Sequence, residues 1–423
     1  MSVYVQDVSG CLGSAIGAAG LTSSEQNVLQ GEAKQALGSL QQAIKEHKLP
    51  FIAGSDRTAT IASQIETAYE QLSAGAKTIM FFGCGDAGLI GQAIAQYGGW
   101  GIPGVMVGTQ KQRPVTRFYS SPDPAAISGA LSRADLDKAR FVFVSRNGDV
   151  STVSQAIAAI EAVRQRGLES AIPNLFLFVT AATAADTGVS NGLVQLGQHY
   201  DVPRITLPTD IDEPFSGLTA AGLLPAIARG LSIRKILDGA GMSVANFLDA
   251  RNWDETPAAH ASAIMVGLIR YRGCRQQFIA PFDDRLAELA RYCLQLRTFG
   301  EEQSEASQIA MLCEGPQERA RLERAIKSGS SAQSCLTLLD SSQRGHGSKL
   351  PKDLAGLAGL NRAIDTSLGD VVAEQQERLS QLCRENGQPV REIRLYQLDE
   401  TTLGALLMDM MLESVLTSEL IRR

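Results

Sequence analysis

The 423-residue sequence has few of the residues from which metal and redox sites are built. It contains four histidines and seven cysteines, all dispersed, and no CxxC pair. No Cys/His set therefore has the spacing of a zinc site. We expect no metal and no cofactor, and we expect reduced, mostly buried thiols of the kind found in cytoplasmic proteins.

Long hydrophobic runs and clusters of one charge are also missing. No run of 18 or more apolar residues occurs, and the N-terminus lacks the basic start and apolar stretch of a signal peptide. The net charge is −6, without a Lys/Arg cluster, which disfavours a nucleic-acid partner. What remains is a globular chain, 44% hydrophobic and 20% charged, long enough for two or three domains.

Short apolar segments alternate with amphipathic helical patterns along most of the chain. After a helix over 21–48, the sequence predicts strands at 78–82, 104–108, 140–145, 175–180 and 204–208. Helices over 217–240 and 259–272 follow, then strands at 275–281, 308–314 and 391–398, and a last helix over 401–420 whose apolar stripe indicates core or subunit interface. This alternation predicts α/β architecture, with parallel sheets covered by helices on both faces. The expected divisions are an N-terminal helical arm (1–60), a first α/β domain (61–230) and a second (231–423).

The first candidate site is the glycine-rich segment FFGCGDAGLIG, residues 81–91. Gly83, Gly85 and Gly88 follow a strand in the GxGxxG pattern that presents backbone N–H groups to a phosphate. Asp86 opposes that use, because a carboxylate about 5 Å from a phosphate repels each unit charge by roughly 3 kcal/mol at an effective dielectric near 20. No acid follows the second predicted strand, which disfavours a dinucleotide. A turn that binds nothing is the alternative.

Two further loops follow predicted strands. Residues 144–152, with Ser145, Asn147 and Ser151 before a helix, can form an anion cradle or a simple helix cap. Residues 210–226 begin with Asp210, Asp212 and Glu213, at the carboxyl end of a strand, where α/β proteins bind ligands. These acids could supply a general base, a Mg²⁺ site or only a solvated turn.

In this order, the loops resemble those of the phosphoglucose isomerase family, which is built from two sugar-isomerase (SIS) domains. FFGCGDAGLIG is similar to the family's first glycine loop, VSRNGDVST to its sugar-phosphate loop and DEPFSGLTAAGLLPA to its GGRFS-to-GLLP segment. QLRTFGEEQ and GSSAQS are similar to the segments that carry the family's glutamate and histidine, and REIRLYQLDETTLGALL to its final strand and helix. The likeness covers about residues 50 to 420.

The resemblance implies two SIS-type, flavodoxin-like parallel-sheet domains and a homodimer. It also implies the interconversion of glucose 6-phosphate and fructose 6-phosphate, a step of glycolysis and gluconeogenesis. The residues carried over as ligand-binding are Gly83, Gly85, Asp86, Ser145, Arg146, Asn147, Gly148, Ser151, Glu213, Ser216, Gln295 and Gln333. Four family positions are changed here: serine to Ala87, arginine to Pro214, glutamate to Phe299 and histidine to Ser334.

Phenylalanine cannot accept a proton, and proline cannot donate a hydrogen bond to an enediolate. The family's proton transfer and its electrostatic stabilisation of the enediolate are therefore lost at these positions. The sequence thus favours a catalytically impaired isomerase-like protein that binds a carbohydrate metabolite or serves as a regulatory or assembly subunit. A second hypothesis is an active sugar-phosphate isomerase with Glu301 or Glu302 as base and His346 opening the ring. A third is a cationic or neutral ligand held by Asp86, Asp149, Asp212 and Glu213.

Overall fold

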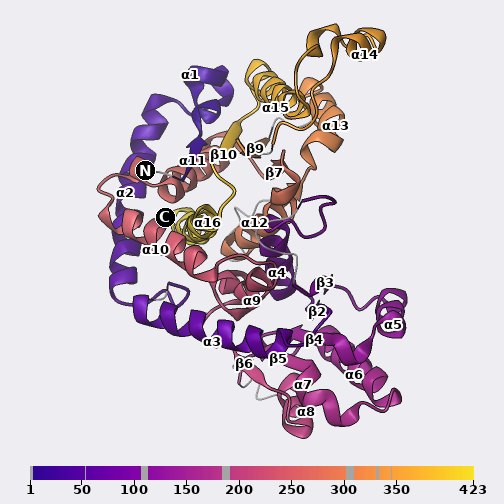
Figure 1. The fold of residues 1–423 in the computed structure, drawn as a ribbon. Coiled ribbons are helices and arrows are strands. Elements are labelled where there is room, and N and C mark those ends of the chain that lie inside the picture. Colours follow the sequence, from indigo (N-terminus) through magenta and orange to yellow (C-terminus); the bar gives the residue numbers. More distant parts are fainter. Residues whose placement is uncertain are drawn as a thin grey trace. The chain divides into compact units, whose positions relative to one another are not determined.

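The computed structural model describes residues 3–52, 54–105, 113–182, 191–301, 309–329, 333–343 and 345–423. The chain divides into two compact units, which we call unit 1 (residues 1–46 and 242–423) and unit 2 (residues 47–241) (Figure 1). The sequence predicts a separate arm over residues 1–60, whereas residues 1–46 belong to the same unit as residues 242–423.

Unit 2 is built on a five-stranded sheet in the order β3-β2-β4-β5-β6, in which all neighbours are parallel. The strands are β2 (Thr78–Phe82), β3 (Val115–Tyr119), β4 (Ala139–Val144), β5 (Phe176–Thr180) and β6 (Arg204–Thr206). The helices are α3 (Ser55–Ser73), α4 (Asp86–Tyr97), α5 (Pro124–Arg133), α6 (Val150–Gln165), α7 (Ile172–Leu175), α8 (Gly192–Tyr200) and α9 (Ala220–Ala228). Strands β4 and β5 are buried throughout, because helices cover both faces.

A ladder of aromatic rings holds the strands of unit 2 in register. Phe82 stacks on Phe143 with ring centroids 4.7 Å apart, and Phe141 stacks on Phe176 at 4.8 Å. These rings point to the face covered by α5, α6 and α8 and form one core cluster with Ile160. Each buried ring stabilises the fold by about 1.5–3 kcal/mol. The ladder therefore fixes where each strand ends and each loop begins.

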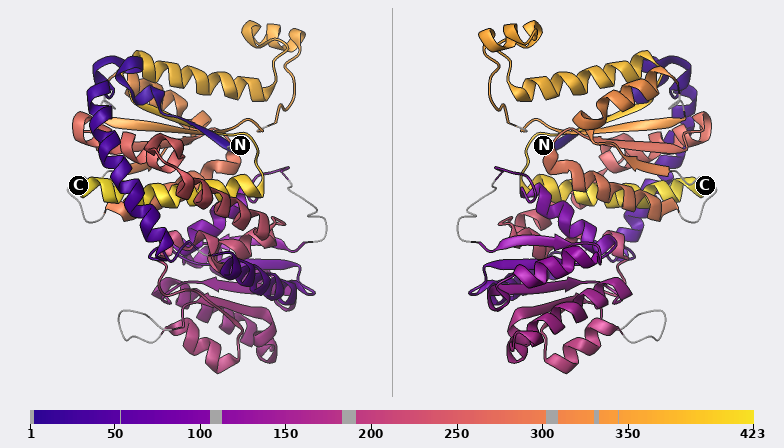
Figure 2. Two further views of the ribbon diagram at one scale, coloured as in Figure 1. Left: turned by 90° about the vertical axis from the view of Figure 1, so that its left-hand side faces the viewer. Right: turned by 90° about the vertical axis from the view of Figure 1, so that its right-hand side faces the viewer.

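Unit 1 is built on a second five-stranded sheet, in the order β1-β10-β9-β7-β8, in which β1 alone is antiparallel to its neighbour. The strands are β1 (Tyr4–Asp7), β7 (Gln276–Pro281), β8 (Ile309–Leu312), β9 (Ser334–Ser341) and β10 (Val390–Leu395). The helices are α1 (Gly13–Ile16), α2 (Ser23–Lys45), α10 (Ile233–Asp249), which begins in unit 2, α11 (Pro257–Arg272), α12 (Ala287–Glu301), α13 (Gly315–Lys327), α14 (Lys352–Leu357), α15 (Leu368–Glu385) and α16 (Glu400–Ile421). Figure 2 shows α15 on one face of this sheet and α16 on the other.

The two sheets share one strand order. Counted along the chain, the strands of unit 2 lie in the order 2-1-3-4-5, and β8-β7-β9-β10 of unit 1 repeat the order 2-1-3-4. By this count β7 corresponds to β2, and β9 corresponds to β4. In such sheets the strand order reverses between the first and third strands, and ligands bind at the carboxyl ends of the strands beside that point.

The predicted α/β class, with parallel sheets between helices, is confirmed. Strand β2 and helix α16 lie where the hydrophobic pattern predicts them. Strands β1, β3 and β9 were not predicted. Of the predicted strand 104–108, residues 104 and 105 are not in a strand, and 106–108 lie outside the described residues. Within the described part of the chain, no helix combines the length and the apolar character that crossing a membrane requires.

Candidate functional site

The first loop of unit 2 carries the chain from β2 into α4 through a closely packed glycine turn. A Cβ on Gly88 would lie 1.9 Å from the carbonyl oxygen of Gly83, and a Cβ on Gly83 would lie 2.8 Å from that of Val144. Gly85 has a φ of 72°, which side chains disfavour. Backbone packing therefore requires these glycines whether or not a phosphate binds there.

The second loop is closed by its own carboxylate. Asp149 caps α6, since its Oδ1 accepts a hydrogen bond from the Thr152 N–H at 2.9 Å, and its Oδ2 accepts one from the Ser145 hydroxyl at 2.7 Å. The Thr152 hydroxyl accepts a hydrogen bond from the Cys84 N–H of the first loop at 3.1 Å. Of the two predicted alternatives, this arrangement is the helix cap, and it occupies groups that an external anion would use.

The third loop contacts the second through Arg146. The Arg146 guanidinium is 3.3 Å from Asp212, and the Arg146 backbone N–H donates to the Glu213 carboxylate at 3.4 Å. The Nε of Arg146 and the hydroxyl of Ser216 are buried and have no hydrogen-bond partner among the described residues. The second and third loops therefore bring a cation and acids together, and the third loop adds a hydroxyl without a partner among the described residues.

The carboxylates of the three loops act on one another. Burial raises the pKa of Glu213, and the nearby charges of Asp86 and Asp149 raise it further, against the opposing effect of the Arg146 N–H and guanidinium. Glu213 thus lies within electrostatic reach of one acid from each of the other two loops. A buried carboxyl group with a raised pKa is a stronger base than an ordinary carboxylate, a property that enzymes use in proton transfer.

The remaining predicted residues of unit 2 lie at the surface of these loops. Asn147 is exposed, and Ser151, in the first turn of α6, is half-buried. Gly148 has a φ of 66°, and a Cβ on it would lie 2.3 Å from Oδ1 of Asn191. This glycine is required by the close approach of the two segments.

The predicted residues of unit 1 lie near opposite ends of the strands of its sheet. Helix α12 carries exposed Gln295, ends at Glu301 and returns the chain to the amino end of β8. The carbonyl of Gln333, just before the amino end of β9, accepts a hydrogen bond from the Arg275 N–H at 2.9 Å. His346 follows the carboxyl end of β9. Glu301, at the end of α12, and His346 therefore lie near opposite ends of the strands, and Glu302 lies outside the described residues.

A buried polar network in unit 1 was not predicted. Glu413 binds Arg391 at 2.7 Å and Arg297 at 2.8 Å, and Tyr4 donates a hydrogen bond to Asp409 at 2.6 Å. Burial raises the pKa of Asp409 to about 6. Burial also acts to raise the pKa of Glu413, but the two arginines outweigh it and hold that pKa below its ordinary value. The sequence feature that could have indicated this network is the pair of acids Asp409 and Glu413 within the apolar stripe of the last helix, because buried acids need polar partners.

The chain is similar in sequence to curated isomerases, although no family model matches it. It is 24% identical over 308 residues to a probable glucose-6-phosphate isomerase of Haloquadratum walsbyi, covering 73% of this chain and 68% of that protein. The match to a probable glucose-6-phosphate isomerase of Natronomonas pharaonis is 29% identical and spans 38% of that protein. The chain is thus similar in sequence to glucose-6-phosphate isomerases.

Solved structures agree with this relationship at the level of the fold. A hypothetical protein of Thermus thermophilus superimposes with a TM-score of 0.76 at 16% identity, covering 99% of this chain and 94% of that one. A glucose-6-phosphate isomerase of Chlamydia trachomatis superimposes with a TM-score of 0.66 at 16% identity, covering 86% of this chain and 68% of that one. The chain therefore shares its α/β fold, with two largely parallel sheets, with these structures, as the resemblance of its loops implies.

Proposed function

We propose that this chain is a sugar-phosphate isomerase of the glucose-6-phosphate isomerase type that transfers protons with groups other than those of the family motifs. The observation that carries this proposal is the similarity to curated isomerases over 73% of the chain. The strand order supports it, because the loops that follow β2 and β4 lie where such sheets bind ligands. The four changed positions favour impaired catalysis, but other side chains can supply proton transfer.

Glu213 is the proposed proton carrier. Its raised pKa, due first to burial, lets it remove the proton from C2 of an aldose and return it to C1. Arg146 lies beside it, and its buried Nε–H, without a partner among the described residues, could donate to the oxygen that becomes negative in the enediolate. Together these groups would replace the missing glutamate and arginine.

The test is turnover by the purified full chain. Fructose 6-phosphate is supplied, and glucose 6-phosphate is followed through a coupled dehydrogenase. We expect turnover that Glu213→Gln lowers by about 10²- to 10⁴-fold, the usual contribution of one acid–base group. Asp210→Asn is the matched control, an exposed acid of the same loop, and should leave the rate unchanged. Equal rates in the wild type and Glu213→Gln would exclude this role.

A binding protein without turnover is the second candidate, and one observation favours it. Asp149 fills the cap of α6 and holds Ser145, which leaves fewer donors for a sugar phosphate. In this case the purified chain would show no turnover, while a carbohydrate metabolite would raise its melting temperature. A regulatory or assembly role would rest on that result.

We also infer that the chain self-associates, as the resemblance implies. The segment around α14 exposes Leu354, Leu357 and Leu360, and Leu357 keeps 87% of its surface accessible. Large apolar side chains grouped on one segment are typical of protein–protein contacts. Sedimentation equilibrium should give a dimer for the wild type and a monomer for Leu357→Glu, with Leu354→Glu as a second variant.

A cytoplasmic location is proposed from the thiols. Seven cysteines are free, and all but Cys84 are buried. Free thiols persist where the surroundings are reducing. Fractionation of cells that express the tagged chain would test the location.

A further inference from the structure

Two buried polar side chains of unit 2 have no part in the reaction proposed above. Thr180 is the last residue of β5, and Asn191 immediately precedes α8; both are almost inaccessible to solvent. They bind each other, since Nδ2 of Asn191 donates a hydrogen bond to the Thr180 hydroxyl at 2.7 Å. Each has further hydrogen-bonding capacity, which a buried polar side chain normally uses.

The two side chains share a third partner, the backbone carbonyl of Arg146 in the second loop. Nδ2 of Asn191 and the hydroxyl of Thr180 each donate to this oxygen at 3.3 Å. The N–H of Ala181 donates to it as well, at 3.0 Å. Three donors, from the end of β5 and the start of α8, therefore hold the peptide group that follows Arg146.

Helix capping alone does not explain the asparagine. Its Oδ1 accepts a hydrogen bond from the Leu193 N–H at 3.0 Å in the first turn of α8, so its NH₂ group faces the second loop. Aspartate, serine or threonine would cap the helix comparably. Asparagine differs from them because it caps with its oxygen and donates with a separate nitrogen. The side chain is thus suited to join the start of α8 to Arg146.

Arg146 carries the two groups that the proposed reaction needs beside Glu213. Its backbone N–H donates to the Glu213 carboxylate at 3.4 Å, and its buried Nε is the proposed donor to the enediolate oxygen. Its guanidinium also binds the Thr209 carbonyl and Asp212. The backbone torsions of Arg146 set the direction of both groups, and a displacement of about 1 Å at a reacting site can lower a rate by about 100-fold.

We propose that Asn191 and Thr180 are positioning residues: by binding the Arg146 carbonyl, they hold the N–H of Arg146 on Glu213 and keep its Nε available to the oxygen that becomes negative. Each acts through Arg146. The inference rests on the proposed function, because it assigns these two residues to the same reaction.

The carboxyl group of Glu213 reports the position of Arg146 without requiring turnover. Burial first, and then the charges of Asp86 and Asp149, raise its pKa, while the N–H and the guanidinium of Arg146 oppose them. If the N–H moves away, the ionised carboxylate loses a donor and the pKa of Glu213 rises further. A lower stability of the fold does not by itself remove this donor.

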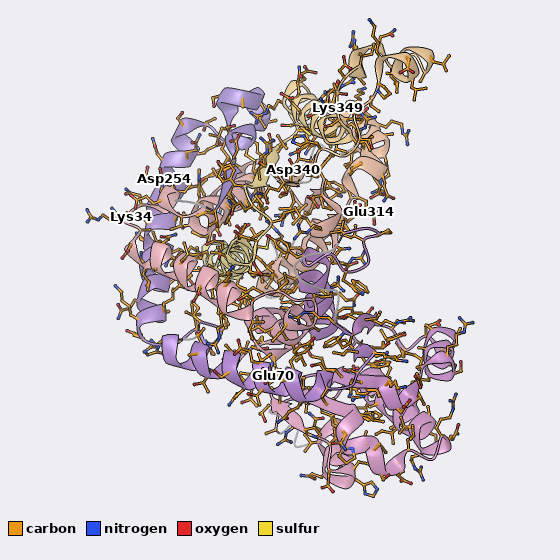
Figure 3. All side chains as sticks on the ribbon, viewed as in Figure 1. Lys34, Glu70, Asp254, Glu314, Asp340 and Lys349 are labelled. Carbon is orange, nitrogen blue, oxygen red and sulfur yellow. The ribbon has the colours of Figure 1, made fainter. Side chains whose placement is uncertain are left out.

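The variants remove the donors and keep the surrounding fold. Asn191→Ser retains a capping oxygen for α8 but no amide, and Thr180→Val replaces the hydroxyl by a methyl group. NMR spectra of the full chain follow the carboxyl signals against pH, and the Glu213 signal is the one that Glu213→Gln removes. We expect a higher pKa of Glu213 in both variants. Glu70→Gln, at an exposed acid of α3 labelled in Figure 3, should remove a different signal and leave that of Glu213 in place.

Turnover of fructose 6-phosphate gives the second readout. Asn191→Ser and Thr180→Val should lower kcat at least about tenfold and change KM by less than about twofold, because the positioned groups act in the transition state. Thr180→Ser keeps the hydroxyl and should match the wild type. Asp123→Ala is the stability control, since it removes the cap of α5, in which Asp123 accepts from the Ala126 N–H at 2.7 Å. It should leave kcat and the pKa of Glu213 unchanged.

A wild-type pKa of Glu213 in both Asn191→Ser and Thr180→Val would overturn the proposal, as would unchanged rates in both while the wild type turns over. A raised pKa in Asp123→Ala would also overturn it. Thr180→Val keeps the test decisive if the Asn191→Ser chain does not fold. Absence of turnover in the wild type would instead exclude the isomerase assignment, and the titration of Glu213 would still decide whether the pair holds Arg146 in place.

Discussion

At the scale of single residues, the carboxylate of Asp149 accepts the hydrogen bonds that the start of α6 could otherwise donate to a bound anion. Asp149 acts as an internal anion at the start of α6, where the sequence allowed either a cap or a cradle for an external anion. The choice depends on one side-chain torsion, which no sequence pattern reports. That Asp86 and Asp149 lie within electrostatic reach of Glu213 could be predicted, because the loops at the carboxyl ends of neighbouring parallel strands lie on the same side of a sheet.

Replacing Asp149 by serine should restore a site for phosphate. The serine keeps a capping oxygen, so the free energy of unfolding should change by less than about 1 kcal/mol. The variant removes one negative charge and frees Ser145, so we expect at least tenfold tighter binding of glucose 6-phosphate. Calorimetric titration measures the affinity, and urea unfolding measures the stability. Asp149→Ala is the comparison, since it also removes the charge but loses the cap and should lower stability by about 1 kcal/mol.

Asp409 should make the stability of the protein depend on pH. Its pKa is about 6 in the fold and 3.8 ordinarily, so the fold favours the protonated acid. Stability from this group is complete below pH 3.8 and decreases as pH rises toward 6, by at most about 3 kcal/mol, since one pH unit is worth about 1.4 kcal/mol. Above pH 6 the loss is constant.

Asp409→Asn tests this linkage. The amide can accept from one of the neighbouring hydroxyls, Tyr4 or Ser243, and donate to the other. The difference in free energy of unfolding between variant and wild type should shift in favour of the variant from pH 4 to pH 6, and then level off. A difference that is constant over this range would show that the pKa of Asp409 is the same in the folded and unfolded states.

At the scale of elements, hydrophobic pattern gave correct predictions where an element is apolar along its length. Strand β2 and helix α16 are such cases. Strand β3 was missed because it is partly exposed and carries Arg117, and β9 because serines occupy both of its ends. Strand β1 is four residues long and pairs only with β10, near the other end of the sequence. Partners so distant leave no local signal.

The glycine turn before α4 gives an element-scale prediction. Gly88→Ala places a methyl group against the carbonyl oxygen of Gly83, which cannot move without shifting β2. We expect a loss of about 1–3 kcal/mol or more, as for overpacked sites. Gly31→Ala in α2 is the control, because nothing lies within 4 Å of its Cβ position and alanine should stabilise the helix by about 1 kcal/mol. Thermal unfolding of both variants measures the contrast, and equal melting temperatures would contradict it.

At the scale of the whole molecule, the strand order shows at which end of the strands each predicted residue lies, which motif spacing alone does not show. The sequence offers Glu301 or Glu302 with His346 as relocated catalytic groups. Helix α12 ends at Glu301, after running back from the carboxyl end of β7, whereas His346 follows the carboxyl end of β9. The acids of α16 were likewise hidden, since an apolar stripe is equally typical of a core or an interface. Only the partners on β1, α10 and β10 show that they form a buried network.

The division into two units predicts which fragments fold. Residues 47–241 contain a complete sheet with its own core, so this fragment should unfold cooperatively when expressed alone. Residues 242–423 lack β1 and α2, and Leu29 and Leu21 of the missing part approach Gly267 of α11. That fragment should remain soluble only when residues 1–46 are supplied. Circular dichroism and limited proteolysis would show the contrast, and a stable 242–423 fragment would refute it.

The pairing of β1 with β10 affects how the molecule can be made. Tyr4 lies opposite Leu395, so β1 has no partner in its sheet until β10 has also been synthesised. Unit 2 can fold in the meantime, as an insertion completed first. During this interval the nascent chain exposes the unpaired strand β1 and the apolar face of α2. A chaperone would protect the chain most during this part of its synthesis.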